Sequence, residues 1–217
     1  MKRRLSRRRL LSAVAALGSL LPALRLRAAD GALEPTPAMT EGPFYPESWP
    51  AAPRPSLIAG ALRAGEPLAL SGSVRDLQGR PVGGARVEIW QCDGLGQYRH
   101  SRDRGAEGGD PGFLGFGWVA ADAAGRWAFE TIRPVPYPGR TPHIHLAVVT
   151  GGARRLVTQI FIDGEPGNAR DGLWRWLPEA ARRRVTIPVV AAATGQGATS
   201  PAGPKRQAGR FDVVLRG

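Results

Sequence analysis

The sequence predicts an all-β protein, an antiparallel β-sandwich with long loops and at most one short helix. Short segments in which apolar and polar residues alternate recur along the chain, and turn-forming residues separate them. Little of the chain shows the longer period of an amphipathic helix. With 217 residues, 42% of them hydrophobic, the chain is long enough for one domain with a packed core.

The alternating pattern begins near residue 66 and continues almost to the end of the chain. Strands are expected at 68–76, 85–92, 117–121, 127–132, 143–149, 156–162, 185–190 and 211–215. The glycine-rich stretch 101–115 predicts a long irregular loop, a feature that is usually functional or mobile. Residues 173–184 form the one candidate helix, which Pro178 would interrupt. Residues 191–203 have no pattern and predict a flexible loop.

Two further parts are expected before the sandwich domain, which we place at 66–217. Residues 1–29 join a basic start to an apolar run that is too short to span a bilayer, which is typical of an export signal peptide. The paired arginines before the run resemble the twin-arginine pattern, and cleavage is expected near Ala28 or Ala29. The alternative is an uncleaved membrane anchor. Residues 30–65 are rich in proline and alanine and predict an extended arm.

The formal charge of +12 is concentrated at the beginning of the chain. Eight lysines and arginines precede the first acidic residue, Asp30, so the remainder carries only +4. This small excess gives no basic stripe that would follow a phosphate backbone, and we expect no nucleic-acid partner. We expect an exported protein, periplasmic or extracellular, with no stable membrane anchor after signal cleavage. The sequence leaves the oligomeric state open.

His143 and His145 form the first candidate metal site. Residues two apart on a strand project from the same face, so the two imidazoles would stand side by side while Ile144 points into the core. This geometry suits metal chelation. The alternative is a pair of surface histidines on an edge strand.

Two of the three tyrosines are candidates to complete that site. Tyr98 follows a predicted strand, and Tyr137 lies in a proline-rich turn six residues before His143. Either ring alone could be a packing residue. Phenolate oxygen is a hard, anionic ligand that favours Fe(III), and a trivalent cation removes the phenol proton. Two phenolates and two neutral imidazoles would leave one positive charge on ferric iron, which a hydroxide would neutralise.

These residues stand within an ordered series of short motifs. The series comprises TEGPFY at 40–45, GSVRD at 72–76, GRPV at 79–82, VEIWQ at 87–91, GQY at 96–98, TIRP at 131–134, YP at 137–138, PHIH at 142–145 and TQ at 158–159. In this order the series resembles the intradiol ring-cleavage dioxygenases, the family of catechol and protocatechuate dioxygenases. The match runs from about residue 36 to residue 163, more than half of the chain.

The resemblance implies a non-haem Fe(III) enzyme that opens catechol-type rings with O2 to give cis,cis-muconate-type products. Tyr98 and His143 would be equatorial iron ligands, and Tyr137 and His145 would be the axial pair. The family's mechanism implies that a catechol binds iron through both oxygens and displaces Tyr137 and hydroxide. The released groups then act as general bases.

Two polar residues also match the family. Arg140 matches an arginine that can stabilise negative charge on the substrate ring, and its alternative is a solvated loop charge. Gln159 matches a polar residue on the neighbouring strand, and its alternative is an ordinary strand hydrogen bond. Only five residues separate Tyr137 from His143. This tight connection predicts a more open pocket and leaves the identity of the catechol undecided.

A non-enzymatic binding module is the rival hypothesis. Transthyretin-like sandwiches share this strand pattern, and His-x-His could hold zinc or copper structurally, since fold alone does not fix function. Replacing Tyr98 or Tyr137 by phenylalanine discriminates, because the enzyme would change colour and lose activity, whereas the binding module would keep its metal. A third hypothesis is a dioxygenase-like protein that has lost its activity.

Overall fold

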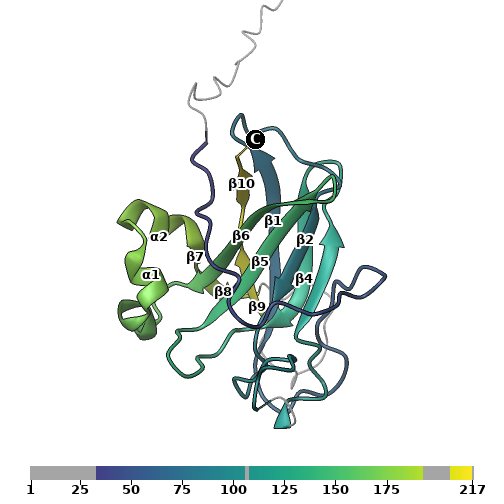
Figure 1. Ribbon diagram of the computed structural model, residues 1–217, viewed down its shortest axis with the longest axis vertical. Helices are drawn as coiled ribbons and strands as arrows, with labels where there is room; N and C mark the ends of the chain where they lie inside the picture. Colours follow the sequence, from purple (N-terminus) through teal and green to yellow (C-terminus); the bar gives the residue numbers. More distant parts are fainter. Residues whose placement is uncertain (1–32, 106–107, 193–205, 217) are drawn as a thin grey trace, which may run out of the picture. The chain divides into compact units, whose positions relative to one another are not determined.

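A β-sandwich forms the body of the protein (Figure 1). The computed structural model describes residues 33–105, 108–192 and 206–216. Within these residues the first sheet contains β1 (Pro67–Asp76), β4 (Arg126–Ile132), β8 (Val189–Ala191), β9 (Gln207–Arg210) and β10 (Val213–Leu215). The second sheet contains β2 (Arg86–Trp90), β3 (Phe116–Ala120), β5 (His143–Thr150), β6 (Ala153–Ile162) and β7 (Thr186–Ile187).

The two sheets are mixed, although antiparallel pairs predominate. In the second sheet the order is β3-β2-β5-β6-β7, and only β7 runs parallel to its neighbour. In the first sheet β4 pairs with β1 antiparallel, whereas β9 and β10 pair in parallel with two successive stretches of β1. The all-β sandwich is thus confirmed, but the parallel pairs and β9 are not foreseen by the sequence. Pairing of β9 and β10 with β1 joins the two ends of the domain, which local patterning cannot indicate.

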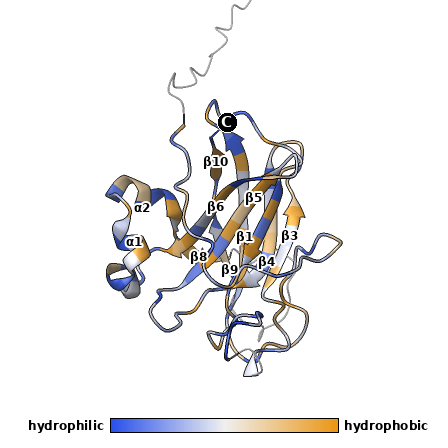
Figure 2. Ribbon diagram, in the orientation of Figure 1, coloured by the Kyte–Doolittle hydropathy of each residue, from blue (hydrophilic) through white to orange (hydrophobic). Residues whose placement is uncertain are grey.

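The hydrophobic core lies where the apolar sides of the strands meet. Trp127 and Phe129 on β4 are buried, and the residues between and beside them are exposed. On β5, Ile144, Leu146 and Val148 are fully buried in the same core. Figure 2 shows the resulting alternation of hydrophobic and hydrophilic residues along the strands. Because apolar burial is the dominant favourable term in folding, this period-two pattern specifies the sandwich.

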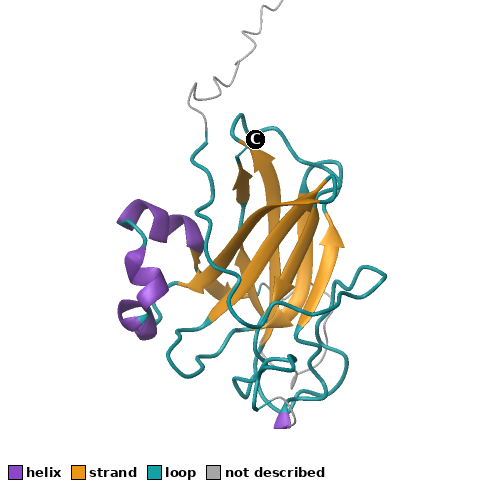
Figure 3. Cartoon of the chain, in the orientation of Figure 1, coloured by secondary structure: helices purple, strands orange, loops and turns teal. Residues whose placement is uncertain are grey.

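The second sheet is buried on both sides. We call the side that carries Ile144 the inner face, and the side that carries His143 and His145 the outer face. Loop residues 33–65 (Figure 3) cover the outer face, where Tyr45 and Trp49 pack against Trp90. Backbone amides of this loop donate hydrogen bonds to carbonyls of β4, β6 and β10. The outer face is therefore enclosed by chain that belongs to no strand.

A short helical segment follows β6 at one side of the sandwich (Figure 1). It consists of the 3-10 helix η2 (Pro166–Arg170), α1 (Gly172–Trp176) and α2 (Glu179–Val185). The single helix expected at 173–184 is thus divided at Pro178, which precedes the first residue of α2. A proline lacks the amide needed inside a helix but is tolerated at its start, which explains the division.

The expectations for the two ends of the chain fall partly outside the described residues. The export signal at 1–29 lies outside them entirely, as does most of the loop expected at 191–203. The described helices include none that is long and apolar enough to cross a membrane. The division into signal, arm and domain at residues 29 and 65 stays a prediction.

Candidate metal centre and active site

His143 and His145 begin strand β5 and lie on the outer face of the second sheet. Both residues are 1% exposed, and Ile144 between them lies in the hydrophobic core. In the register of the sheet, His145 is opposite Trp90 on β2 and Gln159 on β6. The indole of Trp90 stacks on the imidazole of His145, with ring centroids 4.9 Å apart. Sheet pairing and stacking together fix the position of the imidazoles.

Tyr98 lies in the long loop after β2, where local hydrogen bonds fix its backbone. The Asp93 carboxylate accepts a hydrogen bond from the Gln97 amide at 3.0 Å, and the Asp103 carboxylate accepts one from the Tyr98 amide at 2.6 Å. Phe44 from the covering loop stacks on the Tyr98 ring at 4.6 Å between centroids. Tyr98 is consequently buried although it belongs to no strand.

Tyr137 begins a tight turn that ends at Arg140. The Arg140 amide donates to the Tyr137 carbonyl at 2.9 Å, and Gly139 has a φ of +82°. Proline followed by a glycine with positive φ is the arrangement of a type II turn, and Pro138 and Gly139 supply it. The turn presents the Tyr137 ring and the Arg140 guanidinium on the same side of the chain.

The four predicted ligands meet in one place. Ring centroids are 5.4 Å apart for Tyr98 and Tyr137, 6.1 Å for Tyr98 and His145, and 5.5 Å for Tyr137 and His143. The two imidazoles are 4.8 Å apart, with their Nε2 atoms separated by 3.1 Å. We call these residues the four-ring cluster. It joins two phenol oxygens and two imidazole nitrogens from three separate parts of the chain.

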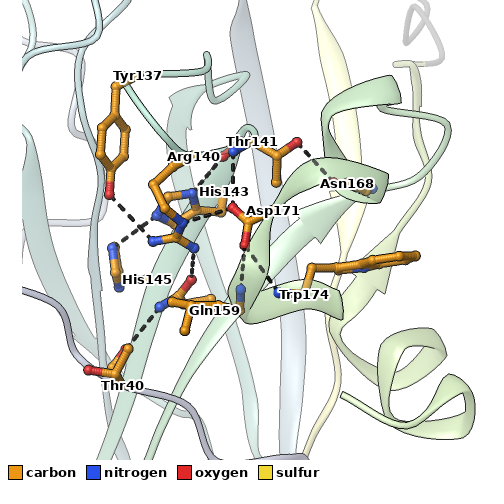
Figure 4. A network of polar contacts seen from close by, with 11 residues as sticks. Thr40, Tyr137, Arg140, Thr141, His143, His145, Gln159, Asn168, Asp171 and Trp174 are labelled. Atoms are coloured by element: carbon orange, nitrogen blue, oxygen red, sulfur yellow. Dashed lines mark hydrogen bonds and ion pairs between the residues drawn. The ribbon is translucent and has the colours of Figure 1, made fainter. Parts of the chain in front are cut away.

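Arg140 links the cluster to its surroundings through three different atoms (Figure 4). Its Nη1 donates to the Tyr137 hydroxyl at 3.4 Å, its Nη2 donates to Gln159 Oε1, and its Nε donates to Asp171 Oδ2 at 2.8 Å. The side-chain amide of Gln159 in turn donates to the Thr40 carbonyl of the covering loop at 2.9 Å. Both polar residues predicted beside the site therefore lie next to the four-ring cluster.

Burial keeps all four rings in their neutral forms. Desolvation, together with the Arg140 charge, lowers the pKa of His143 to about 4, and desolvation with the neighbouring His143 lowers the pKa of His145 well below its usual value. Burial raises the pKa of Tyr98 well above its ordinary value, and it raises that of Tyr137 although Arg140 opposes the shift. The imidazoles are thus ready to act as ligands, whereas the phenols need a nearby cation to ionise.

The donor atoms of the cluster fit a hard trivalent cation. The Tyr98 hydroxyl is buried and has no hydrogen-bond partner among the described residues, an arrangement that costs about 1–3 kcal/mol without a ligand. His143 Nδ1 donates to the Thr141 carbonyl at 2.7 Å, which leaves Nε2 with its lone pair toward His145. Within the described residues, no group of three histidine, cysteine or acidic side chains could hold a metal. A metal here would depend on the tyrosines, whose phenolates favour Fe(III).

A pocket of about 460 Å³ opens beside the cluster. Its lining includes Tyr137, Arg140, Glu165, Arg170 and Asp171. Its volume lies in the range of sites that hold small organic molecules. A ring-sized compound can therefore approach the Tyr137 side of the cluster from this pocket.

The third tyrosine and the third histidine do not join the cluster. The Tyr45 hydroxyl donates to Glu88 at 2.8 Å, and its ring meets the edge of Trp90 at 5.0 Å between centroids, a packing role. His100 lies in the loop after Tyr98, where its Nδ1 accepts a hydrogen bond from the Arg102 amide at 3.0 Å. His100 is therefore a loop residue outside the four-ring cluster.

Sequence reasoning missed three residues that hold the cluster in place. Asp171 binds Arg140, Phe44 stacks on Tyr98, and Trp90 stacks on His145. An aspartate just before a helix is a capping signal, so the sequence could indicate the helix start at Asp171 but not its ion pair. Aromatic residues in a strand or loop give no signal of the ring on which they stack.

Comparison with known proteins places the chain among ring-cleaving enzymes. Residues 40–217 match a family model described as dioxygenase. The chain is 37% identical over 173 residues to the protocatechuate 3,4-dioxygenase beta chain of Burkholderia cepacia, covering 74% of this chain and 71% of that protein. It is 32% identical over 200 residues to hydroxyquinol 1,2-dioxygenase of Nocardioides simplex, covering 83% of this chain and 64% of that protein. This chain therefore spans slightly less than two thirds of the second relative.

Solved structures give the same picture. The dioxygenase domain of a dioxygenase carbohydrate-binding protein fusion from Streptomyces sp. SirexAA-E superposes with a TM-score of 0.64 at 33% identity, covering 84% of this chain and 99% of that domain. Catechol 1,2-dioxygenase from Acinetobacter sp. ADP1 superposes with a TM-score of 0.65 at 25% identity, covering 83% of this chain and 62% of that one. The fold of this chain is therefore similar to that of solved ring-cleaving dioxygenases.

Proposed function

The chain belongs to the intradiol ring-cleavage dioxygenase family, and from that premise we propose that it opens a catechol-type ring with O2 at an Fe(III) centre to give a cis,cis-muconate-type product. The single observation that carries the iron proposal is the four-ring cluster. Two phenols and two neutral imidazoles converge, and one buried hydroxyl has no hydrogen-bond partner in the part of the chain that the structure describes. This set of donor atoms suits ferric iron. Packing of an aromatic core alone does not require phenol oxygens and imidazole nitrogens to converge.

Tyr98, Tyr137, His143 and His145 would hold the iron in this proposal. Bound Fe(III) would supply the electron-accepting power that activates the substrate ring toward O2. Tyr137 is the ligand best placed to move, because it is only partly buried and lines the open pocket, whereas Tyr98 is enclosed. Once released, its phenolate would take a proton from the incoming catechol.

Arg140 and Gln159 would act on the substrate side of the same centre. The Arg140 guanidinium donates to the Tyr137 hydroxyl, so its charge would face the substrate oxygen that replaces that hydroxyl. Gln159 holds a second nitrogen of the same guanidinium. Arg140 would thereby stabilise the negative charge that develops on the ring, and Gln159 would orient it.

We also propose that the enzyme works outside the cytoplasm. The proposal is supported by the basic and apolar composition of residues 1–29, which lie outside the described part of the chain. A folded, metal-loaded domain is the kind of cargo that a twin-arginine route carries. Fractionation of cells that express the full chain, with and without replacement of Arg7 and Arg8 by lysine, tests the route.

Iron loading followed by oxygen uptake tests the central proposal. The purified protein should bind one Fe(III), take on a visible phenolate-to-iron absorption, and consume O2 with at least one compound from a panel of catechols. The Tyr98→Phe and His145→Gln variants should lose the absorption and the activity, because each removes one donor atom. A colourless iron-loaded protein that consumes no O2 with any catechol would refute the proposal.

The chain supplies its own matched controls. Tyr45→Phe and His100→Gln remove the same chemical groups from outside the four-ring cluster, and both variants should keep the colour and the bound iron. If these controls lost iron to the same degree as the cluster variants, the loss would reflect general damage to the fold. The iron proposal would then lose its support.

A further inference from the structure

Asp171 is a buried carboxylate whose two oxygens bind different parts of the molecule. Its residue is 2% exposed, and it lies between η2 and α1. Oδ1 accepts hydrogen bonds from the Leu173 and Trp174 amides at 2.9 and 3.1 Å, which caps α1. Oδ2 accepts from Arg140 Nε at 2.8 Å and from the Thr141 amide at 3.1 Å. One oxygen thus serves the helix, and the other faces the active site.

The Arg140 guanidinium has its orientation fixed on three sides. Nε binds Asp171, Nη1 binds Tyr137 and Nη2 binds Gln159 (Figure 4). Only the Asp171 contact carries a full opposite charge, and the Arg140 side chain is 16% exposed, so solvent screens this pair weakly. Because the guanidinium is planar and rigid, the hydrogen bonds at Nε and Nη2 fix the direction in which Nη1 points.

Asp171 also reaches a predicted ligand through the backbone. Its Oδ2 accepts the Thr141 amide, and the Thr141 carbonyl accepts a hydrogen bond from His143 Nδ1 at 2.7 Å. The Thr141 hydroxyl donates to Asn168 Oδ1 at 3.0 Å, so the helical segment holds this residue twice. A fixed Thr141 carbonyl keeps the proton of His143 on Nδ1 and its lone pair on Nε2.

We propose that Asp171 is a positioning residue for ring cleavage, which sets the orientation of the Arg140 guanidinium and of the His143 imidazole. The inference rests on the proposed function. Asp171 lines the pocket beside the cluster, and its printed side-chain contacts toward the site are with Arg140 and the Thr141 amide, so it acts through these two residues. The helical segment after β6 would then belong to the catalytic machinery and would not be an appendage of the sandwich.

Asp171→Asn separates the two roles of the side chain. The amide oxygen can keep the place of Oδ1 and cap α1, since asparagine is as good a cap as aspartate. The amide nitrogen then occupies the place of Oδ2, where it meets two other donors, Arg140 Nε and the Thr141 amide. The matched control is Asp122→Asn, because Asp122 also accepts two backbone amides through Oδ1 and an arginine Nε, that of Arg126, through Oδ2 at 2.8 Å.

The first measurement needs neither iron nor substrate. Nitrogen-15 NMR of the metal-free protein follows hydrogen exchange at arginine Nε, and Arg140→Lys identifies the Arg140 signal by its disappearance. We expect a protected Arg140 Nε–H whose exchange is at least about tenfold faster in Asp171→Asn and unchanged in Asp122→Asn, because the lost acceptor exposes the donor. Unchanged protection in Asp171→Asn would overturn the proposal, even if the wild-type protein cleaved no catechol.

The second measurement uses the iron-loaded enzyme. Asp171→Asn should lower kcat by about 10- to 100-fold, the range typical of groups that orient metal ligands, with KM and iron content close to wild type when assayed well below the unfolding temperature. A purely structural Asp171 would instead lower the iron content or the folded fraction in step with kcat. That result, or an unchanged kcat, would contradict the positioning role. Inactive wild-type protein would refute the proposed function and leave the NMR result to decide on the contact.

Discussion

The two faces of the second sheet are both buried, yet they are built in different ways. The inner face of β5 carries Ile144, Leu146 and Val148, which are fully buried among other apolar side chains. The outer face of the same strand carries His143 and His145, which are as buried but pack against Trp90 of β2 and against tyrosines from the loops. Adjacent residues of one strand thus belong to two different kinds of interior.

The inner face of the sheet stabilises the folded protein, whereas the outer face carries the candidate catalytic and metal-binding groups. On the inner face, folding removes only apolar side-chain surface from water, and this burial favours the folded state. On the outer face, neutral imidazoles and phenols are kept from water, and no described residue forms a hydrogen bond with the Tyr98 hydroxyl. Such polar burial costs stability unless a ligand offsets it. The comparison predicts that substitutions on the inner face lower the free energy of unfolding most, whereas substitutions on the outer face mainly lower the proposed iron binding and activity.

The largest expected loss of stability is on the inner face. Ile144→Ala should lower the free energy of unfolding by about 2–5 kcal/mol, because it leaves a cavity in a fully buried core. Urea unfolding of the metal-free protein measures this difference. Val190→Ala is the control, because Val190 is 58% exposed and its truncation should cost less than about 0.5 kcal/mol. Similar losses at both positions would break the comparison.

Lowering the pH should reduce the free energy of unfolding, because the outer face buries neutral histidines. His143 has an ordinary pKa of 6.5 that burial lowers to about 4 in the folded protein, so between these values the unfolded chain binds more protons. The stability of the metal-free protein should therefore fall as the pH falls from 6.5 toward 4, by at most about 1.4 kcal/mol per pH unit for this histidine. His143→Gln should make the slope shallower in urea unfolding at several pH values. An unchanged slope would show that His143 titrates alike in both states.

The smallest expected effect is at the edge of the outer face. Tyr45→Phe removes the hydroxyl that donates to the buried Glu88 carboxylate at 2.8 Å, while Arg86 still binds the other carboxylate oxygen at 2.7 Å. The free energy of unfolding should fall by about 1–2 kcal/mol, since the lost donor served a charged group. The ring stays packed on Trp90, so iron binding should not change. A larger loss than that of Ile144→Ala would reverse the proposed order.

The same contrast explains how much of the fold the sequence could predict. Strands such as β1 and β4 alternate apolar and polar residues, and their positions followed from period two alone. Strand β9, with the sequence QAGR, has no such pattern and is a strand because β1 and β8 flank it. The break at Pro178 followed from the missing proline amide. Parallel pairing of distant strands depends on tertiary structure, which local patterns do not contain.

The sequence predicted the residues of the candidate site, but it did not predict the neighbouring residues that hold them in position. The spacing of His143 and His145 on a strand fixes their common face, and the motif series indicated Tyr98, Tyr137, Arg140 and Gln159, all of which lie together. Their metal and catalytic roles stay predictions. Asp171, Phe44 and Trp90 hold them from three other segments. Such contacts join residues far apart in sequence, and one sequence alone gives no measure of that proximity.

The loop that covers the outer face also sets the order of events while the chain is being made. The Thr40 carbonyl is held by the Gln159 amide, and the two residues are 119 positions apart. At a synthesis rate of about 5–20 residues per second, the covering loop leaves the ribosome roughly 6–24 s before its partner strand exists. The site can therefore be completed only late in translation, after Gln159 has been made and has left the ribosome.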